Sequence, residues 1–523
     1  MTPPRDGRTL PVLSGVLLAL AHPPVELLLP AFVGLVPLLV FIAERPEGPA
    51  GRWAAIRAGA LTGVLYFGIQ LYWVAVALTL YSALAVPAYL GLVAILALLT
   101  AGFGGAVHWS RERLGLPVAV AAVLFWTALE WVQGHAGDLA MPWLGLGAAL
   151  APFPTLAGAA DLVGSRGLTA WVAGVNGLVA TAFLRRRRGR PVGGVLAAIA
   201  VVLAGPAAYG VARDAMLETR PAARVAVVQP NIPEELKLDP AVAVDTSLSA
   251  LTALTAGIDE PVDLVVWPEV AVPTRLEGDD SMIARIRALA RDVGAPILVG
   301  AYGGVPIGAA LEDAPTASFN SALLIAPDGP RGRYDKRRLV PFVERVPFID
   351  PAWLGSGRLG GLGRGTGKPV LTAGEAAGFG TLICYESIFG DLSAGYRRDG
   401  ADFLVNITND AWFGRDTWYG RTTGLWQHPA HTVLRAVENR VGVARAANTG
   451  VSMFVDPRGR VYAATPLFQP AVRVETVYTT DEPTLYTRWG DWLATLLTAL
   501  AALLLLAAAV SRPRSPSPLA PEP

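Results

Sequence analysis

Three segments of the sequence carry a carboxylate, an ammonium group and a thiol that could together perform covalent catalysis. Glu269 follows the apolar run Leu264–Trp267, Lys336 follows a hairpin-like turn, and Cys384 lies near the end of the apolar run 380–385. Each reactive side chain therefore falls at or just beyond the end of a predicted strand, where the active sites of sheet proteins collect.

These three side-chain types suit acyl transfer. A free thiol has a pKa of about 8.5, so a neighbouring carboxylate must take its proton at neutral pH. Burial would raise the pKa of Glu269 and fit it for this role. Lys336 would stabilise the thiolate and then the oxyanion of a tetrahedral intermediate, together with backbone N–H groups after the nucleophile. Taken singly, each residue has an ordinary alternative role. Cys384 could be a core residue, Glu269 a solvated or capping carboxylate, and Lys336 a surface charge.

The elements that must position these residues form a mixed α/β domain. Several of its apolar runs are short and continuous, which is typical of strands buried on both faces. We expect a sheet-on-sheet core with helices outside it at 243–256, 281–293 and 426–440. The predicted strands are 224–229, 264–267, 297–302, 321–326, 380–385, 403–406, 442–446, 452–456 and 461–464.

A glycine-rich stretch at 355–367 contains the spacing Gly355-x-Gly357-x-x-Gly360, which formally matches a dinucleotide-binding motif. It follows no clear strand and opens no helical pattern, and Gly367-Lys368 lacks the Ser or Thr of a P-loop. We therefore interpret the stretch as a loop over the site.

The composition places this domain in a membrane protein. Hydrophobic residues make up 53% of the 523 residues and charged residues 16%, against about 25% charged in soluble proteins. The mean hydropathy is +0.43. A net charge of +1 without a basic stripe argues against nucleic-acid binding. The single cysteine excludes an intrachain disulfide and a cysteine-based zinc site, and no metal or cofactor is predicted.

Eight apolar stretches are candidates for membrane spans, since a spanning helix needs about 20 mostly apolar residues. They lie at 10–22, 25–43, 58–79, 84–107, 117–134, 167–184, 191–212 and 488–510. The first also fits the apolar part of a signal peptide, but no cleavage site of small residues follows it. The stretches predict a membrane domain at 1–221, a catalytic domain at 222–480, a transmembrane helix at 481–511 and a Pro/Ser-rich tail at 512–523.

The arginines predict how these spans are oriented, because cytoplasmic loops are enriched in Lys and Arg. With the N-terminus in the cytoplasm, every expected cytoplasmic loop is basic, whereas the opposite loops 80–83 and 135–160 contain neither Lys nor Arg. We therefore expect both termini in the cytoplasm and the catalytic domain on the other face, without access to ATP. The basic residues of the expected cytoplasmic loops and termini are Arg5, Arg8, Arg45, Arg52, Arg57, Arg111, Arg113, Arg185, Arg186, Arg187, Arg188, Arg190, Arg512 and Arg514.

The order Glu269, Lys336, Cys384 in these contexts resembles the nitrilase, or carbon–nitrogen hydrolase, superfamily. With the flanking spans, the chain is similar to the apolipoprotein N-acyltransferase family over nearly its whole length. The motifs that carry the resemblance are Met141–Gly145, Ala160–Gly164, Val228–Ile232, Trp267–Glu269, Tyr334–Lys336, Leu339–Phe342, Cys384–Glu386, Asn409–Gly414, Ala447–Gly450 and Thr487–Trp492.

The resemblance implies an αββα sandwich with a Glu–Lys–Cys triad, in which Cys384 is the nucleophile, Glu269 the general base and Lys336 the oxyanion-stabilising cation. Glu344 would orient Lys336, although it could also be a surface carboxylate paired with Arg345. Where the family has Gly, Glu and Tyr after Pro341-Phe342, this chain has Val343, Glu344 and Arg345. Tyr385 and Glu386 would support the nucleophile. Trp412 and Phe413 would line an acyl entrance or belong to the core.

The resemblance also implies a ping-pong reaction of a monomeric enzyme in the bacterial cytoplasmic membrane. A phospholipid, typically phosphatidylethanolamine, would donate an acyl chain to Cys384. The α-amino group of a diacylglyceryl apolipoprotein would then accept it, in the last step of lipoprotein maturation.

Three alternatives remain at this point. The chain could be another membrane-bound nitrilase-type acyltransferase or amidase, or a catalytically inactive scaffold. A transporter would need charged or broken spans, and Glu130 is the tempting residue for that hypothesis.

Overall fold

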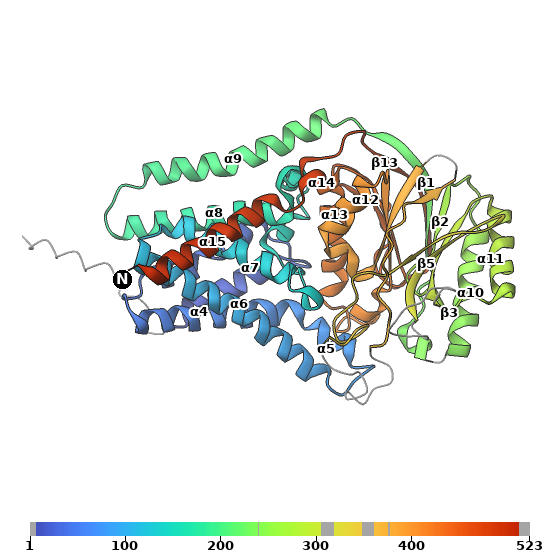
Figure 1. The fold of residues 1–523 in the computed structure, drawn as a ribbon, viewed down its shortest axis with the longest axis horizontal. Helices are drawn as coiled ribbons and strands as arrows, with labels where there is room; N and C mark the ends of the chain where they lie inside the picture. Colours follow the sequence, from blue (N-terminus) through green and yellow to red (C-terminus); the bar gives the residue numbers. More distant parts are fainter. Residues whose placement is uncertain (1–6, 239, 305–317, 348–359, 375–376, 512–523) are drawn as a thin grey trace, which may run out of the picture.

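The computed structural model describes residues 7–238, 240–304, 318–347, 360–374 and 377–511. A helical part formed by the N-terminal residues and the C-terminal helix lies beside an α/β domain formed by the residues between them (Figure 1). The chain thus leaves the helical part once, builds the α/β domain, and returns to the helical part as α15 (Trp492–Val510).

Among the described residues, five helices are long and apolar enough to cross a membrane: Pro49–Leu71, Ala85–Leu114, Leu156–Arg187, Gly193–Met216 and Trp492–Val510. The other three predicted spans correspond to shorter apolar helices at Thr9–Leu20, Leu28–Ala43 and Val118–Gly134. Helix length and composition therefore support five of the eight predicted spans, and the other three stay a prediction.

The helical part contains nine α-helices before the α/β domain, within the described residues. Two predicted spans are interrupted in the structure, one at residues 34–35 and the other at Tyr72. The helices are α1 (Thr9–Leu20), α2 (Leu28–Val33), α3 (Val36–Ala43), α4 (Pro49–Leu71), α5 (Trp73–Leu78), α6 (Ala85–Leu114), α7 (Val118–Gly134), α8 (Ala160–Arg187) and α9 (Gly193–Met216). The 3₁₀ turns between α7 and α8 are η1 (Gly137–Leu139), η2 (Leu146–Leu150) and η3 (Leu156–Ala159).

The first sheet of the α/β domain has the strand order β13-β1-β2-β4-β5-β6, with β3 also paired to β4. The pairs β1–β2 and β2–β4 are parallel, whereas β4–β5, β5–β6 and β1–β13 are antiparallel. The strands are β1 (Arg220–Gln229), β2 (Leu264–Val266), β3 (Val272–Arg275), β4 (Ile297–Gly303), β5 (Phe319–Ala326), β6 (Gly329–Asp335) and β13 (Ala471–Thr479).

The second sheet has the order β12-β11-β10-β9-β8-β7. Its three central strands β8, β9 and β10 run parallel, so their carboxyl ends meet at one edge. The strands are β7 (Leu371–Ala373), β8 (Ala377–Ile383), β9 (Phe403–Thr408), β10 (Val443–Ala447), β11 (Met453–Val455) and β12 (Val461–Tyr462).

Helices cover the outer face of each sheet, and this gives the predicted sandwich (Figure 1). On one side lie α10 (Pro240–Ala256) and α11 (Asp280–Val293), whose buried Leu251, Ile286 and Leu289 pack against Val265 and Ile297 of the first sheet. On the other side lie α12 (Gly390–Arg398) and α13 (Gly424–Asn439), between the second sheet and the helical part.

Buried polar contacts join the α/β domain to the helical part. Arg440, at the C-terminal end of α13, donates from Nε to Asp161 Oδ2 of α8 at 2.9 Å, and both side chains are fully or almost fully buried. The Tyr385 hydroxyl donates to the carbonyl of Ala140 at 2.7 Å. The segment that carries Cys384 therefore touches the helical part directly.

Candidate active site

Glu269 lies just after β2, in a tight turn that brings it under the neighbouring strand. Val270 adopts a left-handed backbone with φ of 46°, which is strained for a β-branched residue. Gly300 of β4 permits this turn, because a Cβ there would lie 2.1 Å from the Pro268 carbonyl oxygen and 2.8 Å from Glu269 Cα. Gly300, on another strand, therefore leaves the space that the turn around Glu269 needs.

Lys336 follows β6 and is almost completely buried between two carboxylates. Its Nζ donates to Glu344 Oε1 at 2.8 Å and to Glu269 Oε1 at 3.2 Å. The amide of Asn320 also donates to both, to Glu269 at 2.7 Å and to Glu344 at 3.0 Å. Glu344 therefore faces Lys336 rather than pairing with Arg345, and its role in orienting Lys336 stays a prediction.

The altered residues on either side of Glu344 do not remove it from this cluster. The backbone N–H of Val340 donates to Glu344 Oε2 at 2.8 Å and closes the loop around the carboxylate. Arg345 instead turns outwards, with its Nε 3.4 Å from Asp138 of the helical part. The departure from the family pattern thus affects the loop's outer face, and the carboxylate stays on Lys336.

Cys384 lies at a sharp elbow between β8 and the 3₁₀ turn η6 (Cys384–Ile388), so the strand ends one residue before the thiol. Its φ of 50° is left-handed, a strained conformation that surrounding contacts must hold. Buried Glu386 ties the elbow to the Lys336 segment. Its Oε2 accepts from Ile383 N at 2.8 Å, and its Oε1 accepts from the Tyr334 hydroxyl, Arg337 N and Arg338 N at 2.7, 2.7 and 3.0 Å.

The electrostatics of the site correct one sequence-based expectation. Burial alone would raise the pKa of Glu269, but Lys336, Asn320 and the backbone N–H of Asn409 outweigh it and lower that pKa. Burial would likewise lower the pKa of Lys336, yet the carboxylates of Glu269 and Glu344 raise it well above its ordinary value. Burial and the charge of Glu269 raise the pKa of Cys384. The resting site therefore holds a neutral thiol beside an ionised carboxylate and an ammonium group.

Several polar residues of this site were not predicted from the sequence. Asn409 donates through its backbone N–H to Glu269 Oε2 at 2.9 Å and through its side chain to buried Glu234 Oε2 at 2.7 Å. Glu234 in turn accepts from the Tyr81 hydroxyl of the helical part at 2.5 Å. Asn409 begins the motif Asn409–Gly414, so its signal was present in the sequence. Asn320 and Glu234 have no comparable signal.

The aromatic candidates occupy different environments. Trp412 is half-buried and stacks on Tyr81 with 4.4 Å between ring centroids. Phe413 is buried edge-on against Trp73 at 4.9 Å and against His428 at 5.2 Å. Tyr385 is also buried, beside Phe389. Trp412 is therefore the more accessible of the two predicted substrate-binding aromatics.

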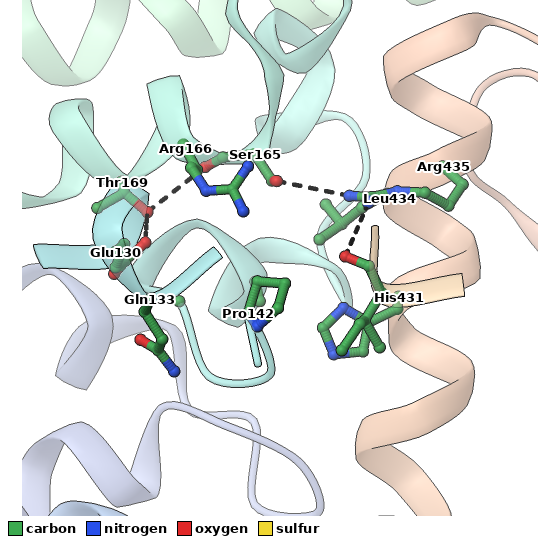
Figure 2. A pocket seen from close by; sticks show the side chains of 12 residues that line it. Glu130, Gln133, Pro142, Ser165, Arg166, Thr169, His431, Leu434 and Arg435 are labelled. Carbon is green, nitrogen blue, oxygen red and sulfur yellow. Dashed lines mark hydrogen bonds between the residues drawn. The ribbon is translucent and has the colours of Figure 1, made fainter. Parts of the chain in front are cut away.

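A second polar cluster lies where α7 and α8 meet α13, around a pocket lined by Glu130, Arg166 and Arg435 (Figure 2). Glu130 is buried there, accepting from Thr169 at 2.5 Å, Leu146 N at 2.8 Å and Trp126 at 2.8 Å. The Glu130 carboxylate therefore accepts hydrogen bonds from its own helix and from neighbouring segments. This supports the interpretation of Glu130 as a structural residue rather than part of a transport path.

Comparison with known proteins follows the same division of the chain. Residues 224–480 match the family described as carbon-nitrogen hydrolase, and residues 14–178 match the apolipoprotein N-acyltransferase N-terminal domain. An amidase structure from Nesterenkonia sp. is 19% identical, with a TM-score of 0.37, and is matched over 54% of this chain and 98% of its own. By the two family matches, the α/β domain is a carbon–nitrogen hydrolase domain joined to an apolipoprotein N-acyltransferase N-terminal domain.

Two relatives match almost the full chain. An apolipoprotein N-acyltransferase of Geobacter metallireducens is 35% identical over 522 residues, which cover 96% of this chain and 95% of the relative. One of Chlorobaculum tepidum is 33% identical over 534 residues, with 96% of each chain covered. The chain belongs to the apolipoprotein N-acyltransferase family.

Proposed function

We propose that the chain transfers an acyl group from a phospholipid to the N-terminus of a diacylglyceryl apolipoprotein, through a thioester on Cys384. The observation that carries this proposal is the buried pairing of Lys336 with Glu269 and Glu344. These groups act electrostatically on the thiol of Cys384. The elbow that carries this thiol lies against the helical membrane part of the chain.

In the first half-reaction, Glu269 accepts the Cys384 proton as the sulfur attacks the ester carbonyl of the phospholipid. Because the thiol is neutral at rest, deprotonation accompanies attack, and the negative charge passes from sulfur to the carbonyl oxygen. Lys336 and the backbone N–H of Tyr385 stabilise that oxygen. Collapse of the intermediate breaks the ester bond. The departing alkoxide takes the proton from Glu269, and lysophospholipid is released.

In the second half-reaction, the α-amino group of the apolipoprotein's N-terminal cysteine attacks the thioester. Glu269 accepts the proton that the amine loses, and the carbon–sulfur bond breaks as the amide forms. The thiolate of Cys384 then recovers its proton from Glu269. The acyl group moves from ester to thioester to amide, so the overall reaction is downhill and needs no nucleotide.

The remaining site residues support this chemistry in distinct ways. Glu344 fixes Lys336 by the 2.8 Å hydrogen bond, and Glu386 holds the nucleophile elbow against the Lys336 segment. Tyr385 anchors the elbow to the helical part. Half-buried Trp412, stacked on Tyr81, forms one wall of the acyl entrance, and Phe413 supports that wall from the core.

The orientation of the chain follows the arginines. We place the eight apolar segments in the membrane, both termini in the cytoplasm and residues 222–480 on the opposite face. Contacts between basic segments support this placement, because Arg113 donates to Ser511 O at 2.6 Å and Arg187 pairs with Glu44 at 2.6 Å. Both contacts join segments expected in the cytoplasm. The catalytic residues then lie at the outer leaflet, where both lipid-anchored substrates are found.

Transfer to the acceptor tests the proposal. Purified protein is loaded with acyl groups from phosphatidylethanolamine and chased with a diacylglyceryl-cysteine peptide, and an N-acetylated copy of the peptide serves as control. We expect the free-amine peptide alone to gain one acyl mass, stable to neutral hydroxylamine. An acyl-enzyme that loses its group only to water would identify a hydrolase instead. Failure of the wild-type chain to load at all would favour the scaffold.

A further inference from the structure

Behind the nucleophile, the structure contains a buried Ser–His–Asp arrangement that the proposed chemistry does not use. His428 of α13 lies with Nε2 3.1 Å from Ser387 Oγ and Nδ1 3.0 Å from Asp410 Oδ1. All three side chains are fully buried. The arrangement has the distances of a hydrolase triad, although Ser387 is completely buried and does not line the pocket of Figure 2.

The same histidine contacts the nucleophile's own backbone. His428 Nε2 lies 3.1 Å from the carbonyl oxygen of Cys384, and the Ser387 hydroxyl donates to that oxygen at 2.9 Å. A carbonyl oxygen only accepts hydrogen bonds. The contact with Nε2 is therefore attractive when that nitrogen carries the ring hydrogen.

The other ring nitrogen faces Asp410, because Nδ1 lies 3.0 Å from Oδ1 and donates to it when Nδ1 carries the ring hydrogen. Arg445 Nη2 donates to Asp410 Oδ2 at 2.7 Å and lies 3.1 Å from Nδ1. Asp410 Oδ1 accepts from the Thr408 hydroxyl at 2.9 Å. Burial and the charge of Arg445 lower the pKa of His428. Each ring nitrogen faces an acceptor oxygen, and Nε2 also lies within hydrogen-bond distance of the Ser387 hydroxyl.

Holding this carbonyl fixes the peptide that follows the nucleophile. The peptide group is planar and trans, so the Tyr385 N–H points away from the Cys384 carbonyl. The direction of that N–H, which faces the developing oxyanion in the proposed reaction, is therefore set by what holds the carbonyl. The left-handed φ of Cys384 makes such support necessary.

The helical part completes the support from the other side of the ring. Trp143 stacks on His428 with 5.5 Å between centroids and an interplanar angle of 18°. Its Nε1 donates to Gln427 Oε1 at 2.7 Å, which fixes the indole. Trp143 belongs to Met141–Gly145, one of the sequence motifs to which the chemistry assigned no role.

We propose that His428, whose Nε2 meets the Ser387 hydroxyl and the Cys384 carbonyl and whose ring is held by Trp143, is a positioning residue that orients the Cys384–Tyr385 peptide for acyl transfer. The inference rests on the proposed thioester chemistry. It assigns the Met141–Gly145 segment of the helical part a place in the active-site geometry.

The test compares single-turnover acylation of Cys384 by phosphatidylethanolamine in full-length protein, followed by intact mass. His428→Gln keeps an amide donor near the Nε2 position, His428→Asn keeps one near Nδ1, and His428→Leu keeps neither. His108→Gln is the matched control, because buried His108 of α6 contacts the carbonyl of Pro46 instead. Loss of an oxyanion donor costs about 10²- to 10³-fold, so we expect misorientation to slow Asn and Leu roughly 10- to 100-fold.

The half-saturating phospholipid concentration should stay within about threefold of wild type in all variants, since the lipid contacts are unchanged. His428→Gln should recover to within about fivefold of the wild-type rate. Equal rates for wild type and His428→Asn would overturn the inference, as would a His428→Gln variant as slow as Asn. If His428→Leu does not fold, the Gln and Asn pair decides. A wild-type chain that forms no adduct would instead overturn the proposed function.

Discussion

Glu344→Gln is the most informative substitution in the site, because it should affect reactivity and catalysis in opposite directions. Before Cys384 ionises, the cluster of Glu269, Glu344 and Lys336 carries a net charge of −1 from its formal charges. The substitution makes that charge zero without changing the side-chain shape. Less negative charge near the sulfur should lower the pKa of Cys384 by about one unit. Alkylation of the thiol by iodoacetamide should then become about tenfold faster at neutral pH.

Acyl transfer should slow in the same variant. Glu344 accepts from Lys336 Nζ at 2.8 Å and from Val340 N at 2.8 Å, and a glutamine amide can accept only on its oxygen side. One buried donor is left unsatisfied, which costs about 1–3 kcal/mol. If Lys336 is displaced as a result, acylation of Cys384 should slow roughly 5- to 150-fold.

The assay follows acyl-enzyme formation by intact mass and alkylation in parallel samples. Glu235→Gln is the control, since Glu235 lies nearby but pairs with Arg415 at the surface. Acylation within twofold of wild type would refute the role given to Glu344. Slower alkylation would refute the electrostatic reasoning.

Three further predictions concern how the fold supports the site. Gly300→Ala should destabilise the protein by about 1–3 kcal/mol and slow acylation, because its Cβ would meet the Pro268–Glu269 backbone. Gly257→Ala, which meets nothing closer than 3.6 Å, should do neither in a thermal unfolding assay. Arg440→Met should cost about 1–3 kcal/mol, because Asp161 keeps its ion pair with Arg213 but the buried carbonyl of Gly158 loses its donor, and an unchanged Tm would contradict this. Burial opposes ionisation of Asp410, but Arg445 and His428 outweigh it and depress the pKa of Asp410. The stability it contributes is therefore full above its unfolded pKa of about 4 and is lost at lower pH. The Tm difference between wild type and Asp410→Asn should hold from about pH 7 to pH 5 and narrow only below about pH 4.

The sequence predicted the elements whose pattern is local. Each predicted span contains a helix, and each predicted strand overlaps an observed one, because apolar runs and turn residues report burial directly. The strand β6 was missed because its residues, Gly329–Asp335, are mostly polar and only partly buried. The strand β13 was missed for a similar reason, since most of its residues are only half-buried.

The site residues that were predicted belong to sequence motifs or to the family pattern, whereas site residues without such a signal were not predicted. Glu269, Lys336 and Cys384 were placed at strand ends, and Glu344 was placed on Lys336 by the family pattern. Burial opposes ionisation of Glu269, and its pKa is lowered mainly by Lys336, whose proximity was predicted. The added contributions of Asn320 and Asn409 were not predictable, because these residues reach the carboxylate from two different sheets. The contacts of His428 likewise depend on how α13 packs against the helical part.

The central claim is that Cys384 carries an acyl group taken from a phospholipid. The most direct test is the intact mass of the purified protein after incubation with phosphatidylethanolamine, with Cys384→Ala treated in parallel. We predict an adduct of one acyl chain on the wild-type protein, released by neutral hydroxylamine and absent from the variant. Folded wild-type protein without an adduct, or an adduct of equal size on Cys384→Ala, would contradict the account.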